Sequence, residues 1–223
     1  MVEQTAHIRS VRGPSPFAAS VKTSLEIQGG LVVSAWYRMD FPQPKTYSMP
    51  MRLFYALTFD EQTLRSLSQI QDTLQPLLLK GRRTAISNLH LTLSFLGEQD
   101  PRLLANLTKV LQKLPCDPIS LEFSQLGMFT KPGGNIIWLG ITKSQQLRTL
   151  QSYLVSMLKE LPVQFTDSPF TEHVTLFRNA HLVSLPETTR LNCSIQAIRL
   201  MHSHQVQGVL TYTPISSNYL SEK

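Results

Sequence analysis

The stretch "NLHLTLSFLG" (residues 88–97) decides the fold, because a shortened copy of it recurs as "HVTLFR" (residues 173–178). Each copy reads His-apolar-Thr-Leu. In a chain of this composition, about 0.5 His-x-Thr triplets are expected by chance. The chance of two such triplets with apolar flanking residues is on the order of 0.004. The pair therefore carries information that a lone histidine on an apolar strand does not.

Strand geometry predicts what each copy presents to its surroundings. Side chains alternate along a strand, so His90 and Thr92 share one face about 6.7 Å apart. Leu91 and Leu93 point to the opposite face, and Phe95 continues this apolar series into the core. Each copy is thus an apolar strand with one polar face.

The polar faces of the two copies predict a site for a phosphate group. If the two halves of the chain pack with approximate two-fold symmetry, His90, Thr92, His173 and Thr175 surround one cleft. The ordinary histidine pKa near 6.5 lets one imidazole take a proton while the other gives one. The alternative for each histidine is a structural role in the core. The alternative for each threonine is the ordinary preference of this β-branched residue for strands.

A metal centre is not expected at this site. Neither copy is accompanied by other His, Asp or Glu residues at ligand spacing, which disfavours a two-metal phosphodiesterase. His202 and His204 share one face of a predicted strand, but no third ligand follows them. We therefore expect no metal and no cofactor.

Composition sets broader limits on the class of protein. The chain has 223 residues, 42% of them hydrophobic, which is enough for a sizeable core. Lys plus Arg outnumber Asp plus Glu by 21 to 15, and this net charge of +6 favours anionic partners. Cys116 and Cys193 form no CxxC pattern, and no apolar run reaches the length of a membrane span. We expect a soluble protein in the reducing cytoplasm.

The first fifty residues differ from the rest of the chain. Residues 1–50 hold no helical or strand period for long, and they contain the turn-rich segments "RGPSPFAAS" and "DFPQPKTYSMPM". One apolar piece, "GGLVVSAWY", is compatible with a strand. We expect an extension outside the core domain, either a disordered tail or a segment ahead of a true start at Met49 or Met51.

Residues 51–223 are expected to form one domain of mixed strands and helices. The segment "RLFYALTF" (52–59) reads as a buried strand, and Asp60 then caps a helix. Asp100 begins a second helix and Ser144 a third, while "KGRR" (80–83) reads as a basic turn. Further strands are expected at 118–125, 135–142, from His173 onward, 192–202 and 209–214. Without strict strand-helix alternation, the class is α+β with mainly antiparallel sheets.

The order and spacing of these segments resemble a known family. "RLFYALTF", "NLHLTLSFLGE", "NIIWLGI", "FTEHVTLFRNA" and "SHQVQGVLTYTPI" look like the RNA 2′,3′-cyclic phosphodiesterases, also called bacterial 2′-5′ RNA ligases, of the 2H phosphoesterase superfamily. The resemblance covers about residues 51–220. It implies a bilobal fold of two mainly antiparallel sheets with pseudo-two-fold symmetry around a central cleft and helices on the outer faces.

The resemblance also implies an activity and its substrates. The expected reaction is metal-independent hydrolysis of an RNA 2′,3′-cyclic phosphate to a 2′-phosphate, with 2′-5′ ligation as a reverse activity. The expected partner is RNA with a 2′,3′-cyclic phosphate or 2′-5′ linkage, such as tRNA fragments, or small cyclic nucleotides, bound by a monomer. The alternative is a non-catalytic module that binds RNA ends or nucleotides on the same fold. Retention of both histidines favours the enzyme.

Residue roles follow from the same resemblance. His173 would activate water and His90 would protonate the leaving 3′ oxygen, although the assignment could be reversed. Thr92, Thr175 and Arg178 would bind the phosphate, with Arg178 alternatively pairing with a surface carboxylate. The family usually has proline before the second histidine; Glu172 stands there instead. A regular strand would point Glu172 away from the cleft, whereas a bulge would bring it toward His173.

Four further residues are weaker candidates for RNA contact. Lys80, Arg82 and Arg83 form a basic cluster just before the first motif, and a solvated loop is the alternative. Trp138 could stack on a base or belong to the core.

Overall fold

The computed structural model describes residues 49–220 except 164, 166–168, 183 and 188–189. Before residue 49 it describes only the backbone of three strands, β1 (Val11–Arg12), β2 (Ala18–Ile27) and β3 (Leu31–Asp40). These strands pair antiparallel in the order β1-β2-β3. They belong to a compact unit, Met1–Tyr47, that is separate from the unit Ser48–Lys223. The strand considered in "GGLVVSAWY" is present as β3, and the placement of residues 1–50 outside the catalytic domain stays a prediction.

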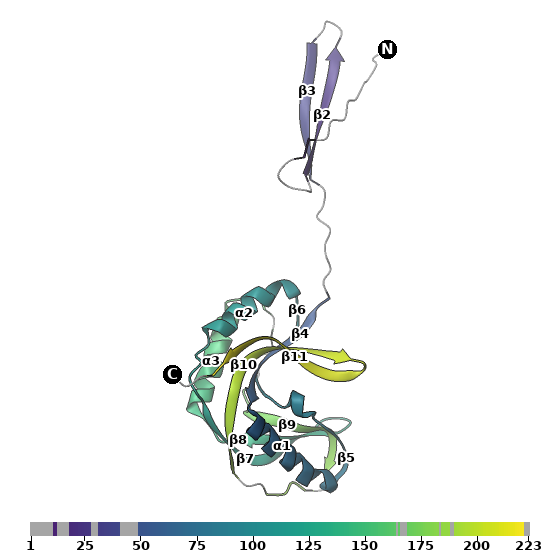
Figure 1. The fold of residues 1–223 in the computed structure, drawn as a ribbon. Helices are drawn as coiled ribbons and strands as arrows, with labels where there is room; N and C mark the ends of the chain where they lie inside the picture. The colour runs from purple at the N-terminus through teal and green to yellow at the C-terminus, as the bar shows by residue number, and fades with distance from the viewer. Residues whose placement is uncertain are drawn as a thin grey trace. The chain divides into compact units, whose positions relative to one another are not determined.

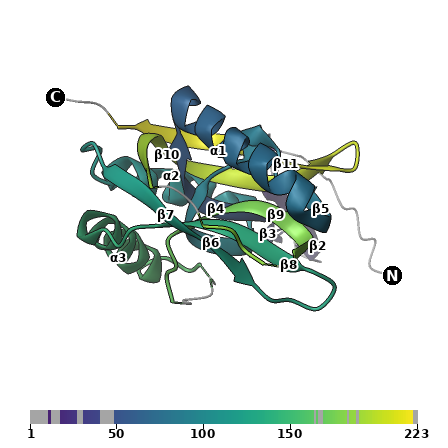
Figure 2. The same ribbon diagram turned by 90° about the horizontal axis from the view of Figure 1, so that it is seen from below.

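The second unit contains one eight-stranded sheet, which divides into two halves of four strands; Figures 1 and 2 show its arrangement. One half contains β4 (Met51–Phe59), β6 (Leu91–Gln99), β10 (Leu191–Val206) and β11 (Val209–Tyr219). The other contains β5 (Leu78–Arg83), β7 (Ser120–Phe129), β8 (Asn135–Ile141) and β9 (His173–Leu182). The order is β11-β10-β4-β6-β9-β8-β7, with β5 on β9, and the start of β10 also pairs with β7. Every pairing in this described unit is antiparallel.

The two halves meet where the motif strands touch. β6 and β9 pair through Leu91 and Val174, the residues that follow the two motif histidines. This contact and the β10–β7 pairing join the two expected sheets into one continuous sheet. The predicted α+β class and mainly antiparallel arrangement are confirmed.

Three helices lie on the outside of the sheet, with α1 and α3 on opposite sides of the body (Figures 1 and 2). They are α1 (Glu61–Leu74), α2 (Leu104–Lys113) and α3 (Gln145–Lys159). Short 3-10 turns occupy Gln75–Leu77, Ile86–Asn88 and Pro101–Leu103. The predicted caps are present: an Asp60 carboxylate oxygen accepts from the Thr63 amide at 2.8 Å, and Ser144 Oγ accepts from the Leu147 amide at 3.3 Å. Asp100 caps the Pro101–Leu103 turn that leads into α2.

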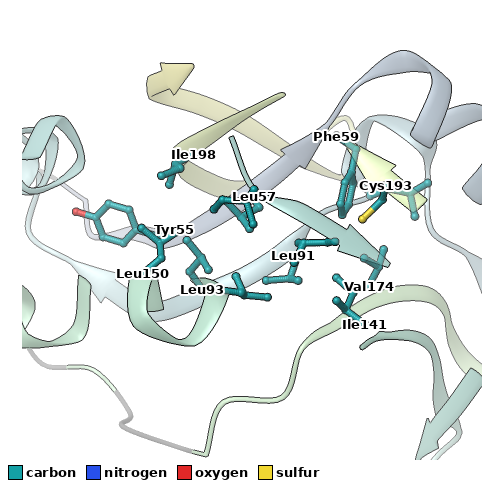
Figure 3. Packing of buried hydrophobic residues seen from close by; sticks show 14 of the residues in the cluster. Tyr55, Leu57, Phe59, Leu91, Leu93, Ile141, Leu150, Val174, Cys193 and Ile198 are labelled. Carbon is teal, nitrogen blue, oxygen red and sulfur yellow. The ribbon is translucent and has the colours of Figure 1, made fainter. Parts of the chain in front are cut away.

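The apolar faces of the motif strands lie in the main core. Leu91 and Val174 are fully buried and Leu93 is nearly so. Figure 3 shows these three side chains in the same interior as Leu57 and Ile141. Burying a leucine side chain stabilises the fold by about 1.5–3 kcal/mol, so the apolar half of each motif fixes where its polar half points.

The predicted basic turn at residues 80–83 is wrong. These residues belong to strand β5, in which Arg82 pairs with Arg178 and Arg83 with Phe177 of β9. β5 is an edge strand, and its charged side chains suit a position with one open side. The pairing aligns Arg82 beside Arg178.

The final two strands form a hairpin whose tip projects beyond the body in both views (Figures 1 and 2). Gln207 and Gly208 form the turn, with φ of 50° and 79°. Positive φ at both positions is typical of the type I′ turn that matches strand twist. Both strands extend beyond their predicted ends. Among the described residues, no helix is both long and apolar enough to cross a membrane.

Limited proteolysis tests the expected boundary of the catalytic domain. Brief trypsin or chymotrypsin digestion should trim the protein to a fragment beginning near residues 45–51, because the two units separate at Tyr47 and Ser48. The truncated protein should retain its thermal midpoint. Persistent protection of sites before residue 45 would contradict an extension outside the domain.

Candidate active site

The two motif histidines emerge at neighbouring points of the sheet. His90 directly precedes Leu91, the first residue of β6, and His173 is the first residue of β9. Because Leu91 and Val174 are paired, the two imidazoles occupy equivalent positions on either side of that contact. The charge of His173 contributes to lowering the pKa of His90. The repeat therefore builds one site.

Each imidazole is oriented in the same way by a backbone carbonyl two residues earlier. His90 Nδ1 lies 2.7 Å from the Asn88 oxygen, and His173 Nδ1 lies 2.8 Å from the Thr171 oxygen. A carbonyl oxygen only accepts hydrogen bonds, so Nδ1 must carry the proton and donate it. In the neutral form Nε2 is then an available base on both rings. His90 Nε2 lies 3.0 Å from Thr92 Oγ1, which can donate to it.

Each imidazole also packs against two aromatic rings. Phe54 and Tyr212 lie with ring centroids 4.9 Å and 5.1 Å from His90. Phe129 and Trp138 lie 5.0 Å and 6.0 Å from His173. This packing restricts ring rotation and excludes water from the ring faces.

Burial and positive charge hold both histidines neutral. Desolvation is the main cause that lowers the pKa of His90 to about 4, with Arg178 and His173 adding to the effect against the Asn88 hydrogen bond. Desolvation and Arg178 likewise lower the pKa of His173, against its bond to Thr171. Without a bound anion, both rings are therefore ready to accept a proton near neutral pH.

Two neighbouring cavities open beside the histidines. The first, the basic cleft, has a volume of about 570 Å³ and includes three arginines along with His90. Its principal lining residues are Arg52, Phe54, Arg82, His90, Thr92, Phe95, Arg178, His204 and Tyr212. The second, the aromatic pocket, has a volume of about 310 Å³ and lies beside His173. Thr92 and Phe95 line both, so the two cavities adjoin at these residues.

Of the three residues predicted to bind phosphate, two line the basic cleft and one does not. Thr92 and Arg178 line the basic cleft, and no carboxylate among the described residues pairs with Arg178. Thr175 lies on β9 two residues after His173, half-buried opposite Trp138, and lines neither cavity. The positive charge of Arg178 is thus open to an anion, whereas phosphate binding by Thr175 stays a prediction.

The three basic residues predicted to contact RNA also differ in whether they line the basic cleft. Arg82 lines the basic cleft, and Lys80 is exposed outside it. Arg83 is instead engaged by α1: its guanidinium donates to Gln71 Oε1 at 3.1 Å, to Ser68 Oγ at 2.8 Å and to the Asp72 carboxylate. Arg83 therefore fastens β5 to α1. It does not line the basic cleft, but it lines a neighbouring cavity of about 220 Å³ that shares Arg82 and Arg178 with that cleft, and its contact with RNA stays a prediction.

Trp138 supports His173 and does not line either cavity. A Cβ on Gly127 would lie 2.1 Å from Trp138 Cζ2, so the indole occupies the space above this glycine on β7. Any larger residue at position 127 would displace the ring that contacts His173. Trp138 is half-buried, and base stacking by its ring stays a prediction.

Glu172 points away from the cleft, as regular strand geometry predicts. Its side chain is only 8% exposed, and its carboxylate pairs with Arg148 Nε of α3 at 2.8 Å. The Glu172 carbonyl accepts from the Ile141 amide at 3.0 Å. The start of β9 is thereby fixed to both α3 and β8, immediately beside His173.

His202 and His204 stack on each other with ring centroids 4.6 Å apart and an interplanar angle of 3°. His204 Nε2 lies 2.8 Å from Thr213 Oγ1, so this nitrogen is already engaged. Within the described residues, no three His, Cys, Asp or Glu side chains cluster as metal ligands would.

Several residues of the site were missed from the sequence. Phe95 was expected in the core but is 41% exposed and lines both cavities. The pairing of β4 with β6 skips Leu93, since Tyr55 faces Ser94 while Ala56 faces Thr92. A bulge reverses the alternation beyond it, which turns Phe95 to the polar face. There, the Arg52 guanidinium lies 4.9 Å from the ring centroid of Phe95.

Asn88 was also missed, and it links His90 to the hairpin. Its side-chain nitrogen donates to the Leu210 carbonyl at 2.8 Å, and its side-chain oxygen accepts from the Tyr212 amide at 3.2 Å. Its own carbonyl binds His90 Nδ1. Asn88 therefore positions both His90 and Tyr212, whose ring packs against the His90 imidazole.

Fold and site together define a two-histidine phosphoesterase. The family model of the 2′-5′ RNA ligase superfamily matches residues 60–203, and the chain belongs to this family. An RNA 2′,3′-cyclic phosphodiesterase of Archaeoglobus fulgidus is 30% identical over 135 residues, which is 57% of this chain and 72% of that protein. One of Escherichia coli is 27% identical over 171 residues, covering 75% and 96% of the two chains.

Solved structures agree with this assignment. The crystal structure of E. coli LigT complexed with 3′-AMP has a TM-score of 0.68 at 25% identity, covering 78% of this chain and 99% of that one. Its apo form has a TM-score of 0.66, again at 25% identity, and covers 78% and 100%. The expected family and fold are confirmed.

Replacing Asn88 tests its role in positioning His90. Asn88→Ala should lower the free energy of unfolding by about 1–3 kcal/mol by removing two hydrogen bonds. It should also reduce kcat/KM by roughly tenfold, because the Asn88 side chain no longer holds the backbone of Leu210 and Tyr212 next to His90. Denaturant unfolding and steady-state kinetics measure the two effects.

Asn218→Ala is the matched control. Asn218 Nδ2 donates to the carbonyls of Leu111 and Leu114, both at 3.2 Å, away from the cleft. This variant should lose comparable stability and keep kcat/KM. Equal kinetic losses in both variants would show that Asn88 acts through stability alone.

Anion binding should be coupled to protonation of the histidines. A sulfate ion beside Arg178 would offset the positive charge that lowers both histidine pKa values, so both pKa values should rise on binding. Sulfate affinity should accordingly increase as the pH falls below the pKa values of the anion-bound histidines, and the increase should continue to about pH 4, where His90 titrates without the anion. Imidazole NMR titrations with and without sulfate measure this directly. Sulfate affinity that does not change with pH would contradict the coupling.

Proposed function

We propose that this protein opens the 2′,3′-cyclic phosphate at RNA ends to a 2′-phosphate by general acid–base catalysis with His90 and His173. The observation that carries the proposal is the matched pair of imidazoles, each with Nδ1 bound to a carbonyl and Nε2 available for proton transfer. They adjoin a cleft that contains Arg52, Arg82 and Arg178. The names of the relatives, RNA 2′,3′-cyclic phosphodiesterases, support the same reaction.

The chemistry requires one proton to be taken and one to be given. His173 Nε2 removes a proton from water as its oxygen attacks phosphorus, and the bond between phosphorus and O3′ breaks. His90 Nε2 supplies the proton to O3′, which leaves the phosphate on O2′. His90 can hold that proton once the substrate anion raises its pKa. The division of roles follows the family resemblance.

The surrounding side chains position and stabilise the phosphate. Thr92 Oγ1, which lies 3.0 Å from His90 Nε2, can donate to a non-bridging oxygen. Arg178 supplies positive charge next to both imidazoles, where a developing negative charge is stabilised most strongly.

The basic cleft is proposed to bind the RNA strand that carries the cyclic phosphate. Arg82 and Arg178 line it with no carboxylate partner among the described residues, so they can contact phosphates. Phe95, covered by Arg52, offers a face for base stacking. E. coli LigT was solved with 3′-AMP, which supports nucleotide binding at this fold. We expect a monomer in the cytoplasm acting on processed ends such as tRNA fragments, or on small cyclic nucleotides.

A non-catalytic binding module is the second candidate. Binding alone would not require two imidazoles with matched orientation. The lowered pKa of His173 suits a base, and the Nδ1 hydrogen bonds of both rings leave both Nε2 atoms for proton transfer. The enzyme is the better-supported function.

Product analysis tests the reaction class. In EDTA, the protein should convert a short RNA ending in a 2′,3′-cyclic phosphate to the 2′-phosphate, identified by mass and by comparison with synthetic standards. The rate should show a bell-shaped pH dependence. A 3′-phosphate product would overturn the assignment of the leaving oxygen, and loss of activity in EDTA would contradict the metal-independent mechanism.

Replacing either histidine tests the catalytic pair. His90→Ala and His173→Ala should each lower kcat by roughly 10² or more, because general acid or base catalysis contributes about this factor. His181→Ala, an exposed histidine further along β9, is the matched control and should retain full activity. Full activity in either motif variant would refute the mechanism.

A further inference from the structure

The residue just before each motif histidine is buried, but the two residues differ in chemistry. Leu89, before His90, is 3% exposed and belongs to the main hydrophobic core. Glu172, before His173, is 8% exposed. Burial alone stabilises a leucine, whereas a buried carboxylate requires a partner of opposite charge. The His173 side of the sheet therefore needs a contact that the His90 side does not.

Arg148 of α3 supplies this contact. Its Nε lies 2.8 Å from Glu172 Oε1, and the two side chains form an ion pair. Helix α3 is itself held in place by the core, because Leu147, Leu154 and Leu158 on it are fully buried. The Glu172 carboxylate is thus attached to a helix whose position the core determines.

The ion pair lies next to the hydrogen bond that orients His173. The carbonyl that accepts from His173 Nδ1 belongs to the peptide bond between Thr171 and Glu172. The carbonyl of Glu172 itself accepts from the Ile141 amide of β8 at 3.0 Å. Because the side chain and the carbonyl of Glu172 are both held, rotation of the peptide that carries the Thr171 oxygen is restricted.

We propose that Glu172 and Arg148 are positioning residues, whose ion pair fixes the hydrogen bond between His173 and the carbonyl two residues earlier. This bond keeps the proton on Nδ1 and leaves Nε2 to accept a proton from water in the proposed reaction. Without the ion pair, the peptide before Glu172 can turn, and the His173 ring can adopt the tautomer whose Nε2 carries the proton. That tautomer cannot act as a base at Nε2. The inference rests on the proposed function and adds the residues that prepare its base.

Breaking the ion pair from either side tests the proposal. Arg148→Met leaves the Glu172 carboxylate without its partner, and Glu172→Ala removes the carboxylate that holds the peptide. In each variant, kcat for hydrolysis of a nucleoside 2′,3′-cyclic phosphate should fall roughly tenfold, a part of the 10²–10⁴ that general base catalysis supplies. KM should change much less, because neither residue lines the basic cleft. Unchanged kcat in both variants would overturn the proposal.

A double variant separates positioning from a general loss of stability. Arg148→Met combined with Glu172→Leu places a buried leucine before His173, as the other half of the sheet has before its own histidine. Replacing both partners of a buried ion pair by apolar residues leaves no uncompensated charge. The double variant should regain most of the lost kcat, and a rate as low as that of Arg148→Met would contradict the proposal. Arg65→Met, which breaks an exposed arginine–glutamate pair on α1, is the matched control and should keep full kcat.

Nitrogen NMR of the imidazoles gives a measurement that does not depend on activity. At about pH 8 both rings are neutral, because burial lowers both pKa values, and the nitrogen shifts then distinguish the two tautomers. In Arg148→Met, His173 should show a mixture of tautomers while His90 keeps its proton on Nδ1, and the double variant should return His173 to one form. A His173 that stays in the Nδ1-protonated form in Arg148→Met would overturn the positioning role. Absence of cyclic phosphate hydrolysis in the unmodified protein would instead refute the proposed function, and the tautomers would still test the ion pair.

Discussion

The pairing of Leu91 with Val174 is the contact on which the site depends. Both side chains are fully buried, so neither strand can slip by one residue without exposing leucine or valine and burying its histidine. Because this pair directly follows the two histidines, it sets their relation to each other. The hydrophobic core therefore determines the geometry of the polar site.

The two halves of the sheet hold their histidines through equivalent contacts, and the site depends on this equivalence. Each ring has one nitrogen bound to the carbonyl two residues earlier and two aromatic rings packed against it. The symmetry ends beyond these contacts, because the His90 side opens to arginines and the His173 side to phenylalanines. Two equivalent bases thus acquire different neighbours, which gives the two sides of the phosphate different chemistry.

Local patterns in the sequence predicted the parts of the structure that depend on neighbouring residues alone. The helix caps at Asp60 and Ser144 and the alternation around His90 are of this kind. Phe95 was misplaced because the bulge at Leu93 arises from pairing with β4. Arg82 and Arg83 could not be told apart, since only contact with α1 separates them. Asn88 was missed because its partners, Leu210 and Tyr212, are distant in sequence.

The central claim is that both imidazoles act on one phosphorus atom. A crystal structure with a nucleoside 2′,3′-cyclic vanadate, which mimics the five-coordinate transition state, tests it most directly. Vanadium should lie between His90 Nε2 and His173 Nε2, with Arg178 next to its oxygens and the base in the basic cleft. Vanadate bound to only one of the two histidines, or outside the space between them, would contradict the two-histidine mechanism.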